Sequence, residues 1–356
     1  MPAQRRASTP GISVVIPAFN AAATLEEALH SVFLQTTTIP LEVIVVDDGS
    51  TDGTAEVLRR FGSAVTTLHQ PNSGLAEARR AGIAMARGDY IALFDADDIC
   101  EPERLAMQSA YLAQRPEVLL VASDFSAFND DGSLGASFGQ SYYGAFRRYP
   151  RGVPDIFSVQ EEFGTAQGTS SGCSVASYRG LIYEKLVLGN FIHPPTVMFR
   201  RTVLDLVGNF DPEAGSMCDW DWIMQVARQG QIGFLKRDLL RYRISSSQMS
   251  GARYRYRRAV DIIRVLERLR RRDPEIYQLH RREFDEKQGA FSLDAADAVC
   301  EEDRIAAFGW LWRSVLRYRH VETRSARILA KLCMPSWLRG LARQIGSGAP
   351  AAVTEG

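Results

Sequence analysis

The sequence predicts an α/β protein: a Rossmann-like, mostly parallel sheet flanked by helices, followed by a helical C-terminal extension. Two observations predict this fold class. Apolar, strand-like runs alternate with amphipathic helical segments through the first hundred residues, and the pattern from about residue 250 onward is helical. Strand, helix, strand in succession implies parallel strands joined by helical crossovers. The 356 residues, 46% hydrophobic and 24% charged, suit a globular protein with room for two domains.

Each expected element rests on its own pattern. Continuous β-branched runs predict buried strands, and apolar residues three and four apart predict helices. Strands are expected at 12–19, 41–48, 64–70, 89–98 and 118–128, and helices at 22–35, 53–61, 74–88 and 102–114. Thr24 is the expected N-cap of the first helix, and Gly88 is expected to close the third.

The chain is expected to divide near residue 250. Residues 1–250 form the sheet domain, and residues 251–356 form a helical, basic region that includes the strongly basic tract 252–272. Within the first domain, residues 129–190 are rich in Gly, Ser, Tyr and Phe and lack periodicity. We expect them to be an insertion of loops over the face that carries the strand ends, because such long loops are usually functional.

Charge and cysteine content exclude several classes of protein. The formal net charge is zero, so nothing global points to nucleic acid. The five cysteines are scattered without a CxxC spacing, which argues against a disulfide framework and a zinc site. No apolar segment follows the first arginines, and no run approaches the roughly 20 residues of a spanning helix. The expected location is the cytoplasm.

Acidic residues follow two of the predicted strands. "VIVVDDGSTD" ends in Asp47 and Asp48, and "IALFDADD" ends in Asp95, Asp97 and Asp98. Parallel strands bring their carboxyl ends to one edge, where ligands bind. Carboxylates gathered there repel one another unless a cation or hydrogen-bond donors offset them. A hard divalent ion shared with substrate phosphates is the natural guest, although "DDGS" alone is equally well read as a solvated turn.

Four motifs in order carry a family resemblance. They are "VVIPAFNAAATLEEALHSVFLQT", "VIVVDDGSTDGT", "NSGLAEARRAGIAMARGDYIALFDADD" and "CDWDW". In these, residues 12–245 resemble the family 2 glycosyltransferases, which have the GT-A fold. The resemblance implies an inverting enzyme that uses Mn²⁺ or Mg²⁺. It would move a sugar from a nucleotide-diphospho-sugar, expected to be a UDP-sugar, to a hydroxyl of a glycan or lipid-linked acceptor in cell-surface polysaccharide synthesis.

The resemblance also implies roles on the donor side. The loop after the first strand would receive the nucleotide, the acidic pair of the second strand would lie near the base and ribose, and an arginine would help to hold the nucleotide. One of the acidic pair should accept a hydrogen bond from the uracil imide. The matching residues here are Pro17, Phe19 and Asn20 for the loop, Asp47 and Asp48 for the pair, and Arg79 for the arginine.

The remaining implied roles concern metal and proton. Asp95 and Asp97 match the DxD motif, with Asp97 the better candidate for direct metal contact and Asp98 able to share it. Asp219 in "CDWDW" matches the general base, and Asp221 would support its position. From the residues alone, Asp219 is equally well an N-cap of the helix that follows.

Departures from the family pattern leave the acids in place. Cys218 stands where Glu is frequent, Ser245 where "YRxH" has His, and Arg80 where Asn is frequent. His193 is expected to be structural in preference to facing the acceptor. Trp220 and Trp222 are expected to pack in the core in preference to stacking on a sugar.

Two other functions remain open from the sequence. A nucleotidyltransferase would need a Gly-rich basic loop after the first strand, and "PAFNAAAT" lacks it. A catalytically silent binding protein with this fold would be favoured by loss of the DxD motif or the base, and both are present.

The tract 324–345 raises the question of an anionic membrane surface. It sets basic residues and apolar residues at helical spacing. The pattern is typical of a helix that lies on the inner face of the membrane, which would make the protein peripheral. It is equally typical of a helix that packs on its own domain and exposes a basic face to solvent.

Overall fold

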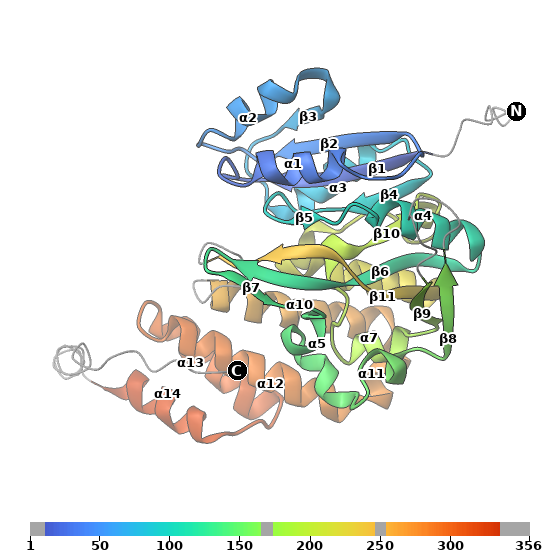
Figure 1. The fold of residues 1–356 in the computed structure, drawn as a ribbon. Coiled ribbons are helices and arrows are strands. Elements are labelled where there is room, and N and C mark those ends of the chain that lie inside the picture. The colour runs from blue at the N-terminus through green and yellow to red at the C-terminus, as the bar shows by residue number, and fades with distance from the viewer. Residues whose placement is uncertain (1–10, 165–173, 246–253, 335–356) are drawn as a thin grey trace, which may run out of the picture. The chain divides into compact units, whose positions relative to one another are not determined.

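The computed structural model describes residues 11–164, 174–245 and 254–334. The chain forms two compact units, Met1–Gln248 and Met249–Gly356. The first unit is built on one sheet with the order β3-β2-β1-β4-β10-β6-β11-β9-β8, while β5 pairs with β11 and β7 with β6 (Figure 1). The strands are β1 (Ile12–Ala18), β2 (Leu41–Asp47), β3 (Thr66–His69), β4 (Tyr90–Leu93), β5 (Ile99–Cys100), β6 (Val118–Asn129), β7 (Gly132–Gly135), β8 (Val159–Gly164), β9 (Ser174–Gly180), β10 (Met198–Arg200) and β11 (Gln231–Arg243).

The sheet is parallel at its N-terminal end and mixed elsewhere. β1 pairs in parallel with both β2 and β4, and β2 pairs in parallel with β3. β10 is antiparallel to β4 and to β6, and β11 is parallel to β6 but antiparallel to β9. The predicted α/β class with a helical C-terminal region is confirmed, and the parallel arrangement holds for the four strands whose helical crossovers were visible in the sequence.

The segment 129–190 contains more than loops. The antiparallel pair β8–β9 extends the main sheet, and short helices lie between β7 and β8. The β8 side chains are mostly half-buried or exposed, so this edge strand shows little of the apolar alternation that marks a strand in sequence. The remaining short elements of the first unit are η1 (Gly62–Ala64), α5 (Gly139–Tyr142), η2 (Gly144–Arg148), α6 (Val153–Ile156), α7 (Tyr183–Val187), η3 (Pro194–Thr196), α8 (Val203–Val207) and η4 (Pro212–Met217).

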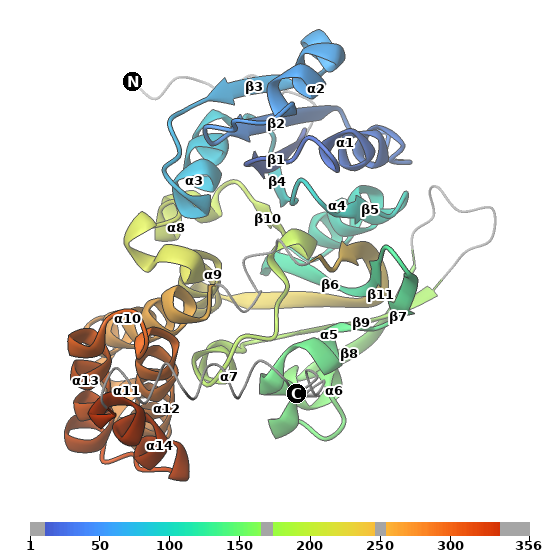
Figure 2. The ribbon, with the colours of Figure 1, turned by 90° about the vertical axis from the view of Figure 1, so that its left-hand side faces the viewer.

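Helices cover both faces of the N-terminal strands. Alternate residues of β2 point to opposite faces: Val43 and Val45 join the main core with α1, while Ile44 and Val46 pack with Ala78 of α3. Figure 2 shows α1 and α3 on opposite sides of these strands. The longer helices are α1 (Leu25–Phe33), α2 (Thr54–Phe61), α3 (Leu75–Met85), α4 (Arg104–Gln114) and α9 (Cys218–Gln229).

One expected helix end is confirmed in position and one was wrong. Thr24 occupies the N-cap position of α1, but its side chain makes no capping hydrogen bond; its hydroxyl donates to the Ala96 carbonyl at 2.9 Å and so ties the helix to the turn after β4. α3 ends at Met85, before Gly88. Gly88 lies against β1, where an added Cβ would come within 2.7 Å of the Ser13 nitrogen. Close backbone approach, not a helix stop, therefore requires glycine there.

The second unit is helical. Its core joins Leu293 and Ala296 of α12, Leu311 of α13, and Ile328 and Leu332 of α14. Its elements are α10 (Arg255–Arg272), α11 (Pro274–Leu279), α12 (Arg281–Val299), α13 (Arg304–Trp312), the π-turn η6 (Arg313–Arg317) and α14 (Thr323–Cys333). Within the described residues, no helix has both the length and the apolar character needed to cross a membrane.

Candidate active site

The loops after β1 and β2 are tied together at the carboxyl edge of the parallel strands. The Asn20 amide oxygen accepts from the Thr51 nitrogen at 2.8 Å, and the Asn20 nitrogen donates to the Ser50 hydroxyl at 2.9 Å. Asn20 has a positive φ of 50°, a conformation that asparagine tolerates better than most residues. Phe19 is 51% exposed beside it, so a large aromatic side chain is open to solvent at this edge.

Asp48 organises the next loop. Its carboxylate accepts from the Gln70 side chain at 2.7 Å and from the backbone nitrogens of Ser73 and Gly74 at 2.8 Å each. Both oxygens are thus engaged by protein donors, and the side chain is buried. Asp48 therefore anchors the segment that leads into α3.

Asp47 is less completely bonded. One carboxylate oxygen accepts from the Ser50 nitrogen at 2.9 Å, and the other lies 3.2 Å from the His69 ring nitrogen Nδ1. Gly49 follows the acidic pair with a φ of +75°, and an added Cβ would come within 2.6 Å of the Asn72 nitrogen. The tight turn that presents Asp47 and Asp48 therefore requires glycine at this position.

Arg79 joins two acidic side chains from distant parts of the chain. One terminal nitrogen of the guanidinium donates to Asp95 at 2.9 Å. The other terminal nitrogen donates to Asp219 at 3.4 Å. Arg79 is only 1% exposed. Burial opposes its charge, but the two carboxylates outweigh that cost and raise the pKa of Arg79 above its ordinary value. The arginine expected at the nucleotide is thus, in this structure, the cation between the DxD motif and the candidate base.

Asp219 lies in the first turn of α9, two residues after the N-cap position. The N-cap position is Met217, so the N-cap alternative for Asp219 is wrong. One carboxylate oxygen accepts from the Trp220 nitrogen at 2.7 Å and the other faces Arg79. Burial raises the pKa of Asp219, and Arg79 offsets part of that rise. A raised pKa makes the ionised carboxylate a stronger proton acceptor.

The acids after β4 differ in their surroundings. Asp95 and Asp97 are half-buried, whereas Asp98 is buried and accepts from the Arg243 nitrogen at 3.0 Å. Arg243 also donates through Nε to the Asp97 carbonyl at 2.9 Å. Burial first, and then the neighbouring Asp97 and Asp95, raise the pKa of Asp98 well above its ordinary value. Asp98 therefore links this turn to β11, and Asp95 and Asp97 are the acids that remain accessible.

The donor set after β4 fits a hard divalent cation that is shared with a ligand. Carboxylate oxygens are the ligands that Mg²⁺ and Mn²⁺ prefer, and Asp98 Oδ2 is buried without a hydrogen-bond partner among the described residues. Among the same residues, no three His, Cys, Asp or Glu side chains converge as a ready-made metal site. Asp95 and Asp97 would thus supply part of the ligand shell, and phosphate oxygens and water the rest.

An aromatic cluster lies near these carboxylates, and the sequence analysis missed it. The Tyr143 hydroxyl is 3.0 Å from His193 Nδ1, and the His193 ring stacks on Phe125 at 4.2 Å. Burial, with smaller effects from Arg79 and Arg104, lowers the pKa of His193 to about 3, so its ring is neutral. Burial also raises the pKa of Tyr143 well above its ordinary value, with contributions from Asp219 and Asp95. Tyr143 belongs to the segment 129–190, whose lack of periodicity gave no signal.

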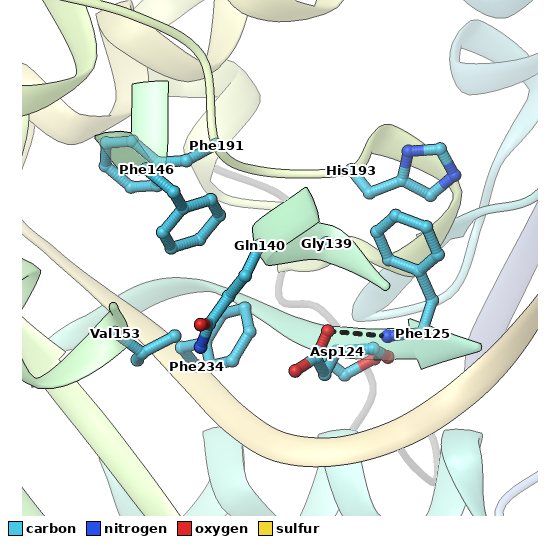
Figure 3. A pocket seen from close by; sticks show the side chains of 10 residues that line it. Asp124, Phe125, Gly139, Gln140, Phe146, Val153, Phe191, His193 and Phe234 are labelled. Atoms are coloured by element: carbon cyan, nitrogen blue, oxygen red, sulfur yellow. Dashed lines mark hydrogen bonds between the residues drawn. The ribbon is translucent and has the colours of Figure 1, made fainter. Parts of the chain in front are cut away.

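The cavity behind this cluster is too small to be a substrate site. It is lined by Phe125, His193, Asp124 and Gln140 among others, and Figure 3 shows the His193 ring over that of Phe125 and the Asp124 carboxylate bonded to the Phe125 nitrogen. Its volume is about 10 Å³, the space of roughly one water molecule. Burial raises the pKa of Asp124. The cavity is therefore a feature of the core beneath the site.

Several expected site residues lie elsewhere than predicted. Pro17 lies inside β1, buried and paired with Val46, so it is not part of the loop after the strand. Trp220 and Trp222 donate to the carbonyls of Leu186 and Gly208, at 2.9 Å each, and are buried, which confirms core packing. Asp221 is also buried, with an oxygen 3.4 Å from the Gln225 amide one turn on.

Comparison with known proteins shows what the first unit resembles. Residues 13–169 match the family model of glycosyl transferase family 2. The chain is 34% identical over 128 residues to chondroitin synthase of Pasteurella multocida, which is 35% of this chain and 13% of that protein. It is 36% identical over 110 residues to the putative teichuronic acid biosynthesis glycosyltransferase TuaG of Bacillus subtilis, 30% of this chain and 43% of that protein. The matches thus span less than half the length of these relatives.

Solved structures share the fold. The mannosyltransferase PcManGT from Pyrobaculum calidifontis, in complex with GDP-Man and Mn²⁺, superposes with a TM-score of 0.52 at 20% identity and covers 91% of this chain and 86% of its own. TarS 1–349 from S. aureus, in complex with UDP-GlcNAc, gives 0.51 at 16% identity, with 87% and 89% covered. At these identities the likeness shows the fold alone. Residues 13–169 of the first unit are therefore similar to glycosyl transferase family 2, and the chain shares the GT-A fold of these solved structures.

Proposed function

We propose that the chain is an inverting glycosyltransferase that moves a sugar from a nucleotide-diphospho-sugar to an acceptor hydroxyl. The observation that carries the proposal is the position of Arg79, which contacts Asp95 with one terminal nitrogen and Asp219 with the other. It places the acid of the DxD motif and the candidate base on either side of one side chain. With Asp95 at the leaving diphosphate and Asp219 at the attacking hydroxyl, one side chain would lie beside the groups that act on both partners of the displacement reaction.

Each acid has a proposed task. Asp219 accepts the proton of the attacking hydroxyl, and burial favours this by raising its pKa. Asp95 and Asp97 hold a divalent cation together with the diphosphate, and a bound Mn²⁺ or Mg²⁺ would neutralise the negative charge of the leaving group. Attack from the side opposite the diphosphate inverts the anomeric centre. Arg79 lies between Asp95 and Asp219 and partly neutralises the negative charge of both when no substrate is bound.

The donor side is proposed to bind a UDP-sugar. Asp47, with one oxygen less fully bonded than those of Asp48, is the better acceptor for the uracil imide, and Asp48 fixes the loop 70–74 beside it. Exposed Phe19 offers a face to the base. TarS, which shares the fold, is seen with UDP-GlcNAc, and PcManGT with GDP-Man, so both nucleotides belong in any test.

The acceptor is proposed to be a glycan or lipid-linked hydroxyl in cell-surface polysaccharide synthesis. Relatives named for chondroitin and teichuronic acid synthesis support this class. The charge of Asp219 contributes to raising the pKa of Tyr143, which belongs to the segment 129–190, and this supports an acceptor role for that segment. The competing nucleotidyltransferase is not favoured, because the loop after β1 is bonded to Ser50 and Thr51 and offers no glycine-rich phosphate cradle.

Membrane association by the tract 324–345 finds no support in its described part. On α14, Ile328 and Leu332 are buried in the core of the second unit, and Arg324 and Lys331 pair with Asp294 and Asp297. The apolar face of this helix therefore packs inward, and residues 335–345 lie outside the described residues. Peripheral location at the inner face of the membrane stays a prediction, which flotation with anionic and neutral vesicles would test.

The proposal is tested by calorimetric titration of UDP-, GDP- and dTDP-sugars with Mn²⁺, followed by turnover assays of whichever donor binds. Binding that needs the metal and is followed by transfer or slow hydrolysis of the sugar supports the enzyme. Metal-dependent binding without any turnover over an extended incubation would favour the silent binding protein instead.

A further inference from the structure

The second unit exposes an apolar surface on α13 that the sequence analysis did not identify. Four large apolar side chains there expose about half of their surface or more: Ile305 at 88%, Phe308 at 49%, Trp312 at 54% and Leu316 at 56%. With Gly309 they are spaced three and four residues apart along α13 and η6, so they form one stripe, called here the α13 stripe. The opposite face, with Ala307 and Leu311, is buried in the core.

The aromatic pair lies at the middle of this surface. Phe308 and Trp312 stack on one another with ring centroids 5.9 Å apart and planes at 15°. Each ring keeps about half of its surface open to solvent, although a helix normally places such residues on its packed face. Large aromatic side chains at the centre of an apolar patch are the usual anchors of a protein interface.

Gly309 also indicates that another helix packs on the α13 stripe. It lies within α13, on the stripe, and is exposed. An added Cβ would meet nothing within 4 Å, and Gly309 has no positive φ, so neither the packing nor the backbone of the unit requires glycine. Glycine inside a helix lowers its stability relative to alanine. The absence of a side chain at Gly309 would allow another helix to approach closely, and this explains why glycine stands on an exposed apolar face.

The charges at the two ends of the stripe have opposite signs. Glu301, Glu302 and Asp303 are exposed just before α13, with Arg304 the single cation among them. At the other end, Arg317 and Arg319 are exposed, although Arg317 lies 3.7 Å from Glu267. Two antiparallel copies of this segment would place the acidic end of each beside the basic end of the other. A lipid surface of either charge would match only one end.

We propose that the α13 stripe is a self-association surface, on which a second copy of this chain packs its own α13 in antiparallel orientation about a two-fold axis near Gly309. Such a pairing is self-complementary, because each residue that contacts a neighbour is contacted in return. The proposal concerns the second unit and is independent of the proposed catalytic function.

The first test is the oligomeric state of the full chain, measured by sedimentation velocity from low to high micromolar concentration. Wild type is expected to form a dimer. Trp312→Glu is expected to weaken the association by more than about tenfold, the loss typical of an aromatic anchor. Leu279→Glu is the matched control: Leu279 ends α11, is 68% exposed and lies outside the stripe, so its variant should still dimerise. Circular dichroism melts check that both variants fold.

Gly309→Gln distinguishes helix pairing from other uses of the stripe. An added Cβ meets nothing within 4 Å and Gly309 is exposed, so the melting temperature should rise or stay unchanged while dimerisation is lost. Glu302→Arg and Arg319→Glu should each weaken self-association, and an equimolar mixture of the two should restore a dimer.

Three results would overturn the proposal. One is a wild-type chain that is monomeric throughout the concentration range. Another is a Gly309→Gln variant that dimerises as well as wild type. The third is a monomeric chain that floats with anionic vesicles, loses that binding in Trp312→Glu and keeps it in Gly309→Gln, which would assign the stripe to a membrane.

Discussion

Arg79 and Asp219, 140 positions apart in the sequence, meet in the first unit, where Arg79 Nη1 lies 3.4 Å from an Asp219 carboxylate oxygen. The other terminal nitrogen of Arg79 holds Asp95 at 2.9 Å. Because Arg79 is buried and its positive charge contacts both acids, a change at any of the three residues alters the electrostatic environment of the other two. The donor and acceptor sides of the proposed reaction are thereby coupled.

Arg79→Gln should destabilise the protein strongly. It leaves two carboxylates without their shared cation, and removing one partner of a buried charge network typically costs about 3–5 kcal/mol. Urea unfolding followed by circular dichroism measures the loss. Arg80→Gln is the matched control, because Arg80 is the next residue but lies on the surface and pairs only with Glu77. Equal stability of the two variants would contradict the role assigned to Arg79.

The pH dependence of transfer should report the raised pKa of Asp219. Only the ionised carboxylate accepts a proton, so the rate should fall as the pH drops through that pKa. Because burial raises it, the midpoint of the acidic limb should lie above the ordinary aspartate value of about 3.9.

In Arg79→Gln, if it folds, the acidic limb should move to still higher pH, because Arg79 lowers the pKa of Asp219 in the wild type. A profile whose acidic limb has the same midpoint in both proteins would show that the titrating group does not sense Arg79. In that case the group would not be Asp219.

Asp97→Ala should sharply weaken UDP binding in Mn²⁺ while the protein stays folded. Asp97 is half-buried, so its loss should remove a proposed metal ligand without opening the core. Calorimetry with and without Mn²⁺ measures the effect, and Asp205→Ala, an exposed acid on α8, serves as control. Unchanged affinity in Mn²⁺ would remove Asp97 from the metal site.

Asp48→Asn should loosen the loop that precedes α3. The carboxylate accepts from the backbone nitrogens of Ser73 and Gly74, and an amide cannot accept from both and from Gln70. A buried donor left unpaired costs about 1–3 kcal/mol. Hydrogen exchange at these two amides should accelerate, and full protection in the variant would show that Asp48 is not the anchor.

Much of the fold could be predicted because each N-terminal strand and helix has a clear pattern of apolar residues within its own segment. β1, β2 and β4 are continuous apolar runs, and parallel pairing by helical crossovers follows from their order. β8 could not be predicted, since it lies at the edge of the sheet, where its side chains are mostly half-buried or exposed and show little apolar alternation. Thr24 takes the predicted N-cap position, but the local pattern could not show that its hydroxyl bonds to Ala96, a partner 72 positions away.

The acids of the site could be predicted by type but not by arrangement. The strand ends showed Asp95, Asp97 and the pair at 47–48, yet nothing local separates Asp98, which Arg243 holds from a distance of 145 positions. The contact of Arg79 with Asp219 is likewise a product of tertiary packing. Tyr143 and His193 come from segments with no periodic signal and meet only in the folded chain.

The most direct test of the account is the separation of binding from transfer in Asp219→Asn. Asparagine keeps the size of the side chain but loses the proton acceptor, so transfer should fall by about two to four orders of magnitude. Donor binding in Mn²⁺, measured by calorimetry on the same preparation, should stay within a few-fold of wild type, because the proposed metal ligands Asp95 and Asp97 are retained and Arg79 still holds Asp95. Transfer at near wild-type rate in this variant would contradict the account and return Asp219 to a structural role at the start of α9.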